Sequence, residues 1–117
     1  MRWPKEILDV VSWGLDIEPK EGYRREEVFQ ALLDETARRL VWRCKGDPAN
    51  VSGCLRWPYT PLGSVINEGI GGRVLRLSMD GSRWGQAVDE IHGFIEANAA
   101  AVCEAYRDQG TPYPDRF

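Results

Sequence analysis

A single histidine and three cysteines are the side chains of this sequence best suited to metal chemistry. Thiolate and imidazole groups together form zinc sites, in which each ligand lies about 2.0–2.3 Å from the metal. His92 and Cys103 are eleven positions apart on one predicted helix, which separates them by about 16 Å along its axis. These two residues cannot share an ion, and Cys44 with Cys54 makes no site alone. We therefore expect no metal and no other cofactor.

The same residue types suggest a cysteine nucleophile activated by a histidine base. Such a pair must lie within hydrogen-bond reach. Cys103 is too far from His92 along their shared helix, which leaves Cys44 or Cys54 as the only partners. Nothing else in the sequence supports that pairing. We expect no catalytic residues and no enzymatic activity, with a thiol–histidine enzyme as one alternative.

Basic and aromatic residues alternate in the middle of the chain. Residues 37–58 hold five basic residues and one acidic residue. Clusters of this kind bind single-stranded nucleic acid by stacking and phosphate contact, and Arg with Trp also dominates protein–protein hot spots. A structural explanation competes with both, because cations favour a helix C-terminus and tryptophans are common in cores. The predicted partner-binding residues are Arg38, Arg39, Trp42, Arg43, Arg56, Trp57 and Tyr59.

The longest predicted element is a helix over residues 82–107. Apolar residues recur there with the helical period: Trp84, Val88, Ile91, Ile95, Ala99, Val102 and Tyr106. The opposite side carries small residues, although a mid-helix glycine costs about 0.5–1 kcal/mol relative to alanine. Small residues allow a second helix to approach closely, whereas alanine also simply fills exposed helical positions. The hypothetical self-association face consists of Gly93, Ala97, Ala100 and Ala101.

Shorter patterns predict the other elements. Apolar spacing predicts helices over residues 4–14 and 24–43, the first ending near Gly14. The second has Glu26 and Glu27 in its first turn and Arg43 near its end, which suits the helix dipole. Residues 16–23 predict a polar loop, residues 54–57 an edge strand or a loop, and residues 64–68 a helical turn or half of a hairpin. Residues 73–79 alternate as a strand, which needs a partner in residues 51–66 or in another copy.

These elements predict an α+β fold of three helices and a short two-stranded antiparallel sheet, with the long C-terminal helix across the core. An all-α fold is the alternative. The length of 117 residues fits one globular domain, over residues 1–110. Residues 111–117 are predicted to be an extended tail.

Composition narrows the function. The chain has 43% hydrophobic and 28% charged residues and a formal net charge of -3, which is ordinary for a folded protein and unlike a nucleic-acid coat. An odd number of cysteines without a paired motif predicts reduced thiols in the cytoplasm, and no apolar run approaches a membrane span. We expect a non-enzymatic domain that binds a protein partner. Small inhibitors, immunity proteins and accessory proteins of phages or mobile elements share this description. A nucleic-acid-binding module using residues 38–59 is the alternative.

Overall fold

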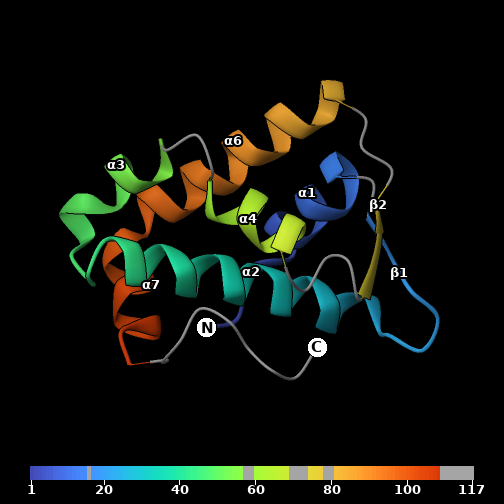
Figure 1. Cartoon of the computed structure of the whole chain (residues 1–117), viewed down its shortest axis with the longest axis horizontal. Helices are drawn as coiled ribbons and strands as arrows, with labels where there is room; N and C mark the ends of the chain where they lie inside the picture. Colours follow the sequence, from blue (N-terminus) through green and yellow to red (C-terminus); the bar gives the residue numbers. More distant parts are fainter. Residues whose placement is uncertain (16, 57–59, 69–73, 78–80, 109–117) are drawn as a thin grey trace.

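The structure, a computed structural model, describes residues 1–15, 17–56, 60–68, 74–77 and 81–108. Within these ranges the chain is dominated by helices and has one small antiparallel sheet, as predicted, but it contains six α-helices rather than three (Figure 1). The predicted tail over residues 111–117 lies outside the described residues. The elements are α1 (Lys5–Leu15), β1 (Ile17–Pro19), α2 (Arg25–Arg43), α3 (Val51–Leu55), α4 (Pro61–Glu68), β2 (Leu75–Leu77), α6 (Gly81–Ala97) and α7 (Ala99–Tyr106).

Helices α2 and α6 form two sides of the molecule, with α1 and α4 between them (Figure 1). The main contacts of α1 are with α6, and those of α2 are with α4. The two-stranded sheet lies at one end of the molecule, and α3 and α7 lie at the other (Figure 1). One hydrophobic core joins residues from all six helices.

Helix α2 is buried over much of its length. Its bounds and its charged ends agree with the prediction for residues 24–43, with Glu26 and Glu27 in the first turn and Arg43 in the last. Residues 35–41 are all buried, so this half of the helix is covered on every side. A helix covered all round is part of the core and has no solvent-facing stripe. The charged side chains within residues 35–41 therefore lie inside the protein.

Helices α1 and α6 approach each other closely at Gly14. A Cβ atom built on Gly14 would lie 2.0 Å from the Cβ of Ala87 and 3.3 Å from the backbone oxygen of Arg83. Gly14 lies inside α1, which continues to Leu15. The helix thus ends one residue after Gly14, close to the predicted end. The missing side chain of Gly14 also lets the two backbones meet.

The predicted helix over residues 82–107 is broken at Asn98. This residue has φ -117° and ψ 27°, and it separates α6 from α7. Its backbone N–H and its side-chain Nδ2 both donate to the carbonyl oxygen of Phe94, at 3.0 and 2.8 Å. Asparagine side chains compete in this way with regular helix bonds. The predicted apolar stripe nevertheless faces the core on both helices, with Ile91, Ile95, Val102 and Tyr106 buried.

The sheet pairs β1 with β2 in antiparallel register. Ile17 faces Leu77, Glu18 faces Arg76 and Pro19 faces Leu75, so opposite charges lie across from each other at the exposed middle position. The strand at 75–77 agrees with the prediction, but its partner does not. The partner comes from residues 16–23, which were expected to form a loop, and not from residues 51–66 or another copy.

Residues 48–68 are helical where they are described. A 3-10 turn at Pro48–Asn50 leads into α3, and α4 follows after residue 60. The edge strand expected near residues 54–57 is not formed by the described part, because Cys54 and Leu55 belong to α3. Helix α4 begins at Pro61, three residues before the expected turn, and buries Leu62, Val65 and Ile66.

Trp3 joins the start of the chain to α2 and α7. Its indole Nε1 donates to Asp34 Oδ1 at 3.1 Å and to the Tyr106 hydroxyl at 3.2 Å. The Tyr106 hydroxyl in turn donates to Asp34 Oδ1. The Trp3 ring also packs against Phe94, with centroids 5.6 Å apart. Only 2% of Trp3 is exposed. The hydrogen-bonded cluster of Trp3, Asp34 and Tyr106 therefore covers one edge of the core.

Candidate functional site

Trp42 is the most exposed of the large hydrophobic residues in the described part of the chain, with 64% of its surface accessible. It follows the buried half of α2 and extends from the last turn of that helix. Two pockets flank its indole ring, and Trp42 and Lys45 line both of them. Large exposed aromatic groups beside polar residues are typical of binding sites. We call this region the Trp42 surface; it consists of Trp42, Arg43, Lys45, Cys54 and Arg107.

The larger pocket has a volume of about 550 Å³ and is lined, among described residues, by Trp42, Arg43, Lys45 and Cys54. Helices α2 and α3 therefore supply its described walls. The Arg43 guanidinium donates to the Ser64 hydroxyl of α4 at 3.4 Å, which holds that side chain against its neighbours. The pocket is thus lined by an indole ring, a thiol and two cations, Arg43 and Lys45.

The structure separates the predicted partner-binding residues into buried and exposed ones. Arg38 and Arg39 are only 9% and 4% exposed. Both pair with buried Glu35, through Nη1 to Oε2 at 2.7 Å for Arg38 and through Nε to Oε1 at 3.3 Å for Arg39. These two arginines therefore lie in the interior of the protein. They do not form an exposed basic stripe with Trp42, as the sequence pattern implied.

The remaining predicted residues divide further. Arg56 is exposed at the end of α3. Trp57 and Tyr59 lie outside the described residues, so their part in the predicted surface stays a prediction. Sequence reasoning missed Arg107, a cation that lines the second pocket beside Trp42. No nearby spacing signals this contact, because it depends on how α7 turns after Asn98.

The hypothetical self-association face is exposed within the single chain. Gly93, Ala97, Ala100 and Ala101 are all accessible, and a Cβ atom on Gly93 would meet nothing within 4 Å. The break at Asn98 assigns two of these residues to α6 and two to α7. They therefore do not share one straight helical face. Self-association through them stays a prediction, which the mass in solution would test.

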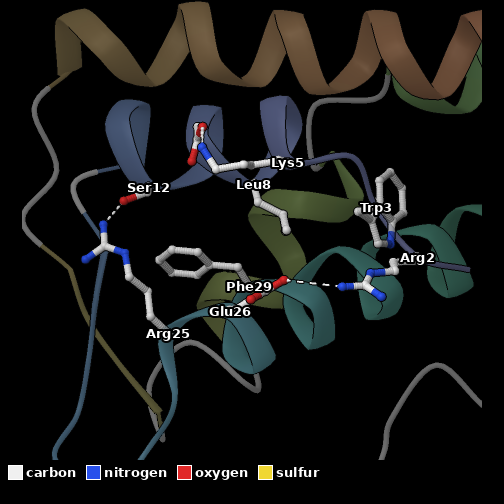
Figure 2. Close-up of a pocket in the computed structure, with 9 residues that line it drawn as sticks. Arg2, Trp3, Lys5, Leu8, Ser12, Arg25, Glu26 and Phe29 are labelled. Atoms are coloured by element: carbon white, nitrogen blue, oxygen red, sulfur yellow. Dashed lines mark hydrogen bonds and ion pairs between the residues drawn. The ribbon is translucent and has the colours of Figure 1, made fainter.

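A separate cleft lies between α1 and α2 (Figure 2). It has a volume of about 400 Å³, with Leu8 and Phe29 between the helices and charged residues around them. The rim residues bind one another: Arg2 pairs with Glu26 at 3.9 Å, Lys5 pairs with Asp9 at 3.1 Å, and Arg25 donates to the Ser12 hydroxyl. Because its polar groups are mutually satisfied, we consider this cleft a weaker candidate than the Trp42 surface.

Two of the three thiols, Cys54 and Cys103, have a raised pKa, which does not favour the nucleophilic thiolate. Cys44 and Cys103 are buried, and Cys54 is partly buried. Burial, with the neighbouring Cys44 thiol, raises the pKa of Cys103 to about 11. Burial likewise raises the pKa of the Cys54 thiol. Nucleophilic cysteines instead need a lowered pKa and an adjacent base.

His92 also lacks the contacts of a general base. Its Nε2 atom is buried and has no hydrogen-bond partner in the part of the chain that the structure describes. Burial lowers the pKa of His92, although the charges of Asp89 and Glu96 oppose this effect. Protonating a buried imidazole carries an electrostatic cost. We therefore regard His92 as a structural residue.

We expect the protonation of His92 to destabilise the fold in mild acid. Its folded-state pKa lies below the ordinary histidine value of about 6.5, so the unfolded chain binds the proton more readily. Stability should therefore fall as pH drops below about 6.5, by less than about 1.4 kcal/mol per pH unit. Urea unfolding of wild type and His92→Leu between about pH 7.5 and 5.5 measures this difference. Equal pH dependence in both proteins would contradict the expectation.

Within the described residues, no group of three or more histidine, cysteine or acidic side chains is arranged to hold a metal ion. No described helix combines the length and apolar character needed to cross a bilayer. In comparisons with known proteins, the chain matches no family model, no curated protein and no solved structure. The case for a function therefore depends on the surface itself.

Proposed function

We propose that this chain is a non-enzymatic interaction domain that binds a protein partner through the Trp42 surface. The observation that carries the proposal is the 64% exposure of Trp42 between two pockets. Leaving an indole in water forgoes the favourable transfer of its apolar area. A partner that covers this ring would recover that free energy.

The composition of the surface supports a protein partner. Trp and Arg are the residues most enriched at protein–protein hot spots, and apolar anchors surrounded by polar rims are the usual arrangement. The Trp42 surface provides one large aromatic group, a pocket of about 550 Å³ beside it, and cations at its edge. Small inhibitors, immunity proteins and accessory proteins of phages or mobile elements are the class that we propose for it.

A nucleic-acid module remains the second hypothesis from the sequence, but no observation favours it. Two of its expected phosphate-binding residues, Arg38 and Arg39, are buried and neutralised in part by Glu35. Their burial weakens the continuous basic path that a phosphate backbone requires. The same experiment distinguishes the two hypotheses.

The experiment is an affinity purification from lysate of the native host, with wild type, Trp42→Ala and Trp13→Ala as immobilised proteins. We expect one stoichiometric protein to be retained by wild type and by Trp13→Ala, with or without nuclease. Trp42→Ala should lower its affinity about 30-fold or more, as expected for removal of a hot-spot residue. Trp13 is a matched control, since it is also exposed (45%) but lies on α1.

Two results would contradict the proposal. Equal retention by Trp42→Ala would show that a bound partner does not use this surface. Retention that disappears with nuclease would favour the nucleic-acid hypothesis, in which affinity falls steeply as salt increases.

A further inference from the structure

The smaller pocket beside Trp42 has an unusual charge distribution. Its volume is about 180 Å³, and its lining residues are Arg38, Val41, Trp42, Lys45, Gly46, Tyr106 and Arg107. Every charged side chain among these described residues is a cation. Two come from α2 or the turn after it, and Arg107 follows α7. Charges of one sign around a small pocket attract an ion of the opposite sign.

Backbone conformation places two of these cations at the pocket. Lys45 and Gly46 both have positive φ, at 55° and 72°, and this reverses the chain after α2. Arg107 then lies against the bare α-carbon of Gly46, where an added Cβ would be 3.6 Å from its Nε atom. Glu104 pairs with Arg107 at 3.3 Å from the preceding turn of α7. That carboxylate is 79% exposed, so water screens the pairing.

Arg38 supplies a donor that the protein does not satisfy. Its Nη1 atom binds Glu35, but its buried Nε atom has no hydrogen-bond partner among the described residues. A guanidinium keeps all of its protons, so this N–H remains a donor. An unpaired buried donor is costly, and an added acceptor relieves that cost. Arg38 thus adds buried positive charge beside the pocket, while Lys45 and Arg107 supply its solvent-accessible cations.

We infer that the smaller pocket receives a carboxylate side chain, aspartate or glutamate, of the protein partner. This inference rests on the proposed function of the Trp42 surface. A space of about 180 Å³ is smaller than an ordinary small-molecule site, and it suits one side chain. Because Trp42 also borders the larger pocket, the partner segment places an apolar side chain there. The recognised feature is thus an acidic residue close to an apolar one.

Selection from a random peptide library displayed on phage tests this specificity. Wild type, Trp42→Ala, Arg107→Glu and Arg24→Glu serve as the immobilised proteins. Arg24 is the matched control, because it forms a similar exposed i,i+3 pair with Glu27 far from the pocket. We expect peptides selected on wild type and Arg24→Glu to contain an acidic residue near an apolar one. Trp42→Ala should not bind them.

The selected peptides are then synthesised with the acidic residue replaced by its amide. We expect this change to weaken binding to wild type on the order of 10- to 100-fold and to have little effect on Arg107→Glu. Peptides that need Trp42 but tolerate the amide equally on both proteins would overturn the carboxylate inference and leave the proposed function standing. If no peptide depends on Trp42, both the inference and the proposed function fail.

Discussion

Replacing Glu35 with glutamine is expected to lower the free energy of unfolding by about 3–5 kcal/mol. Glu35 is 1% exposed and is the carboxylate that holds Arg38 and Arg39 inside the protein. The amide keeps the shape of the side chain but removes its charge. The buried guanidinium of Arg38 would then lose its charged partner, and that of Arg39 would lose its pairing with Glu35. The loss is large against the 5–15 kcal/mol that is typical of whole domains.

Two controls separate this effect from a general sensitivity to lost ion pairs. Glu27→Gln removes the partner of Arg24 in an exposed pair, and it should change stability by no more than about 0.5 kcal/mol. A triple variant with Glu35, Arg38 and Arg39 replaced by leucine or methionine should match or exceed wild type by about 1–4 kcal/mol. Urea unfolding followed by circular dichroism measures all three. A small loss in Glu35→Gln would refute the argument.

The state of Glu35 explains why the triple variant is expected to be stable. Burial raises the pKa of Glu35, even though the charges and hydrogen bonds of Arg38 and Arg39 act in the opposite direction. This burial cost applies to all three charged groups of the cluster, and apolar side chains of similar volume do not incur it. Charged groups under these conditions specify an arrangement more than they stabilise it.

Alanine at Gly14 is expected to destabilise the protein by about 1–3 kcal/mol, although alanine is the better helix former. The new Cβ atom would lie 2.0 Å from the Cβ of Ala87, so α1 and α6 must move apart. Alanine at Gly93 is the matched control, because nothing lies within 4 Å of its added Cβ. That variant should be more stable than wild type by about 0.5–1 kcal/mol. Two changes of equal sign in urea unfolding would contradict this packing argument.

Periodic patterns predicted the long elements well. Helix α2 followed from its apolar spacing and its charged ends, and the stripe of α6 and α7 followed from the recurrence of Ile91, Ile95 and Val102. Those signals are local, and the structure keeps them. Helix α4 also carried a local signal, since Pro61 precedes Leu62, Val65 and Ile66 at helical spacing. The prediction of a helical turn or half of a hairpin over residues 64–68 gave too little weight to proline as a first helical residue.

The partner strand of the small sheet could not be predicted in the same way. Strand β1 has only three residues, Ile17 to Pro19, which is too short to show alternation and ends in a residue typical of loops. Its partner is almost sixty positions away in sequence. Pairing over that distance is decided by the packing of helices around the strands.

The candidate site was predicted only in part, for a related reason. The cations near the end of α2 were expected to face solvent. Lys45 is exposed and Arg43 is partly buried. Burial of Arg38 and Arg39 depends on neighbouring elements that cover this half of α2, which the spacing of its own residues does not reveal. Glu35 stands three and four positions before the two arginines, a spacing that allows pairing. That spacing does not show whether the ion pair is exposed to solvent or buried.

The hydrogen bonds of Trp3 affect the order of events during protein synthesis. Its partner Tyr106 lies 103 residues later in the chain, and ribosomes add about 5–20 residues per second. For about 5–20 seconds the indole of a nascent chain therefore has no Tyr106 to bind. The edge of the core that Trp3 closes can form only after α7 has emerged. Until then the incomplete chain exposes apolar surface, to which chaperones can bind.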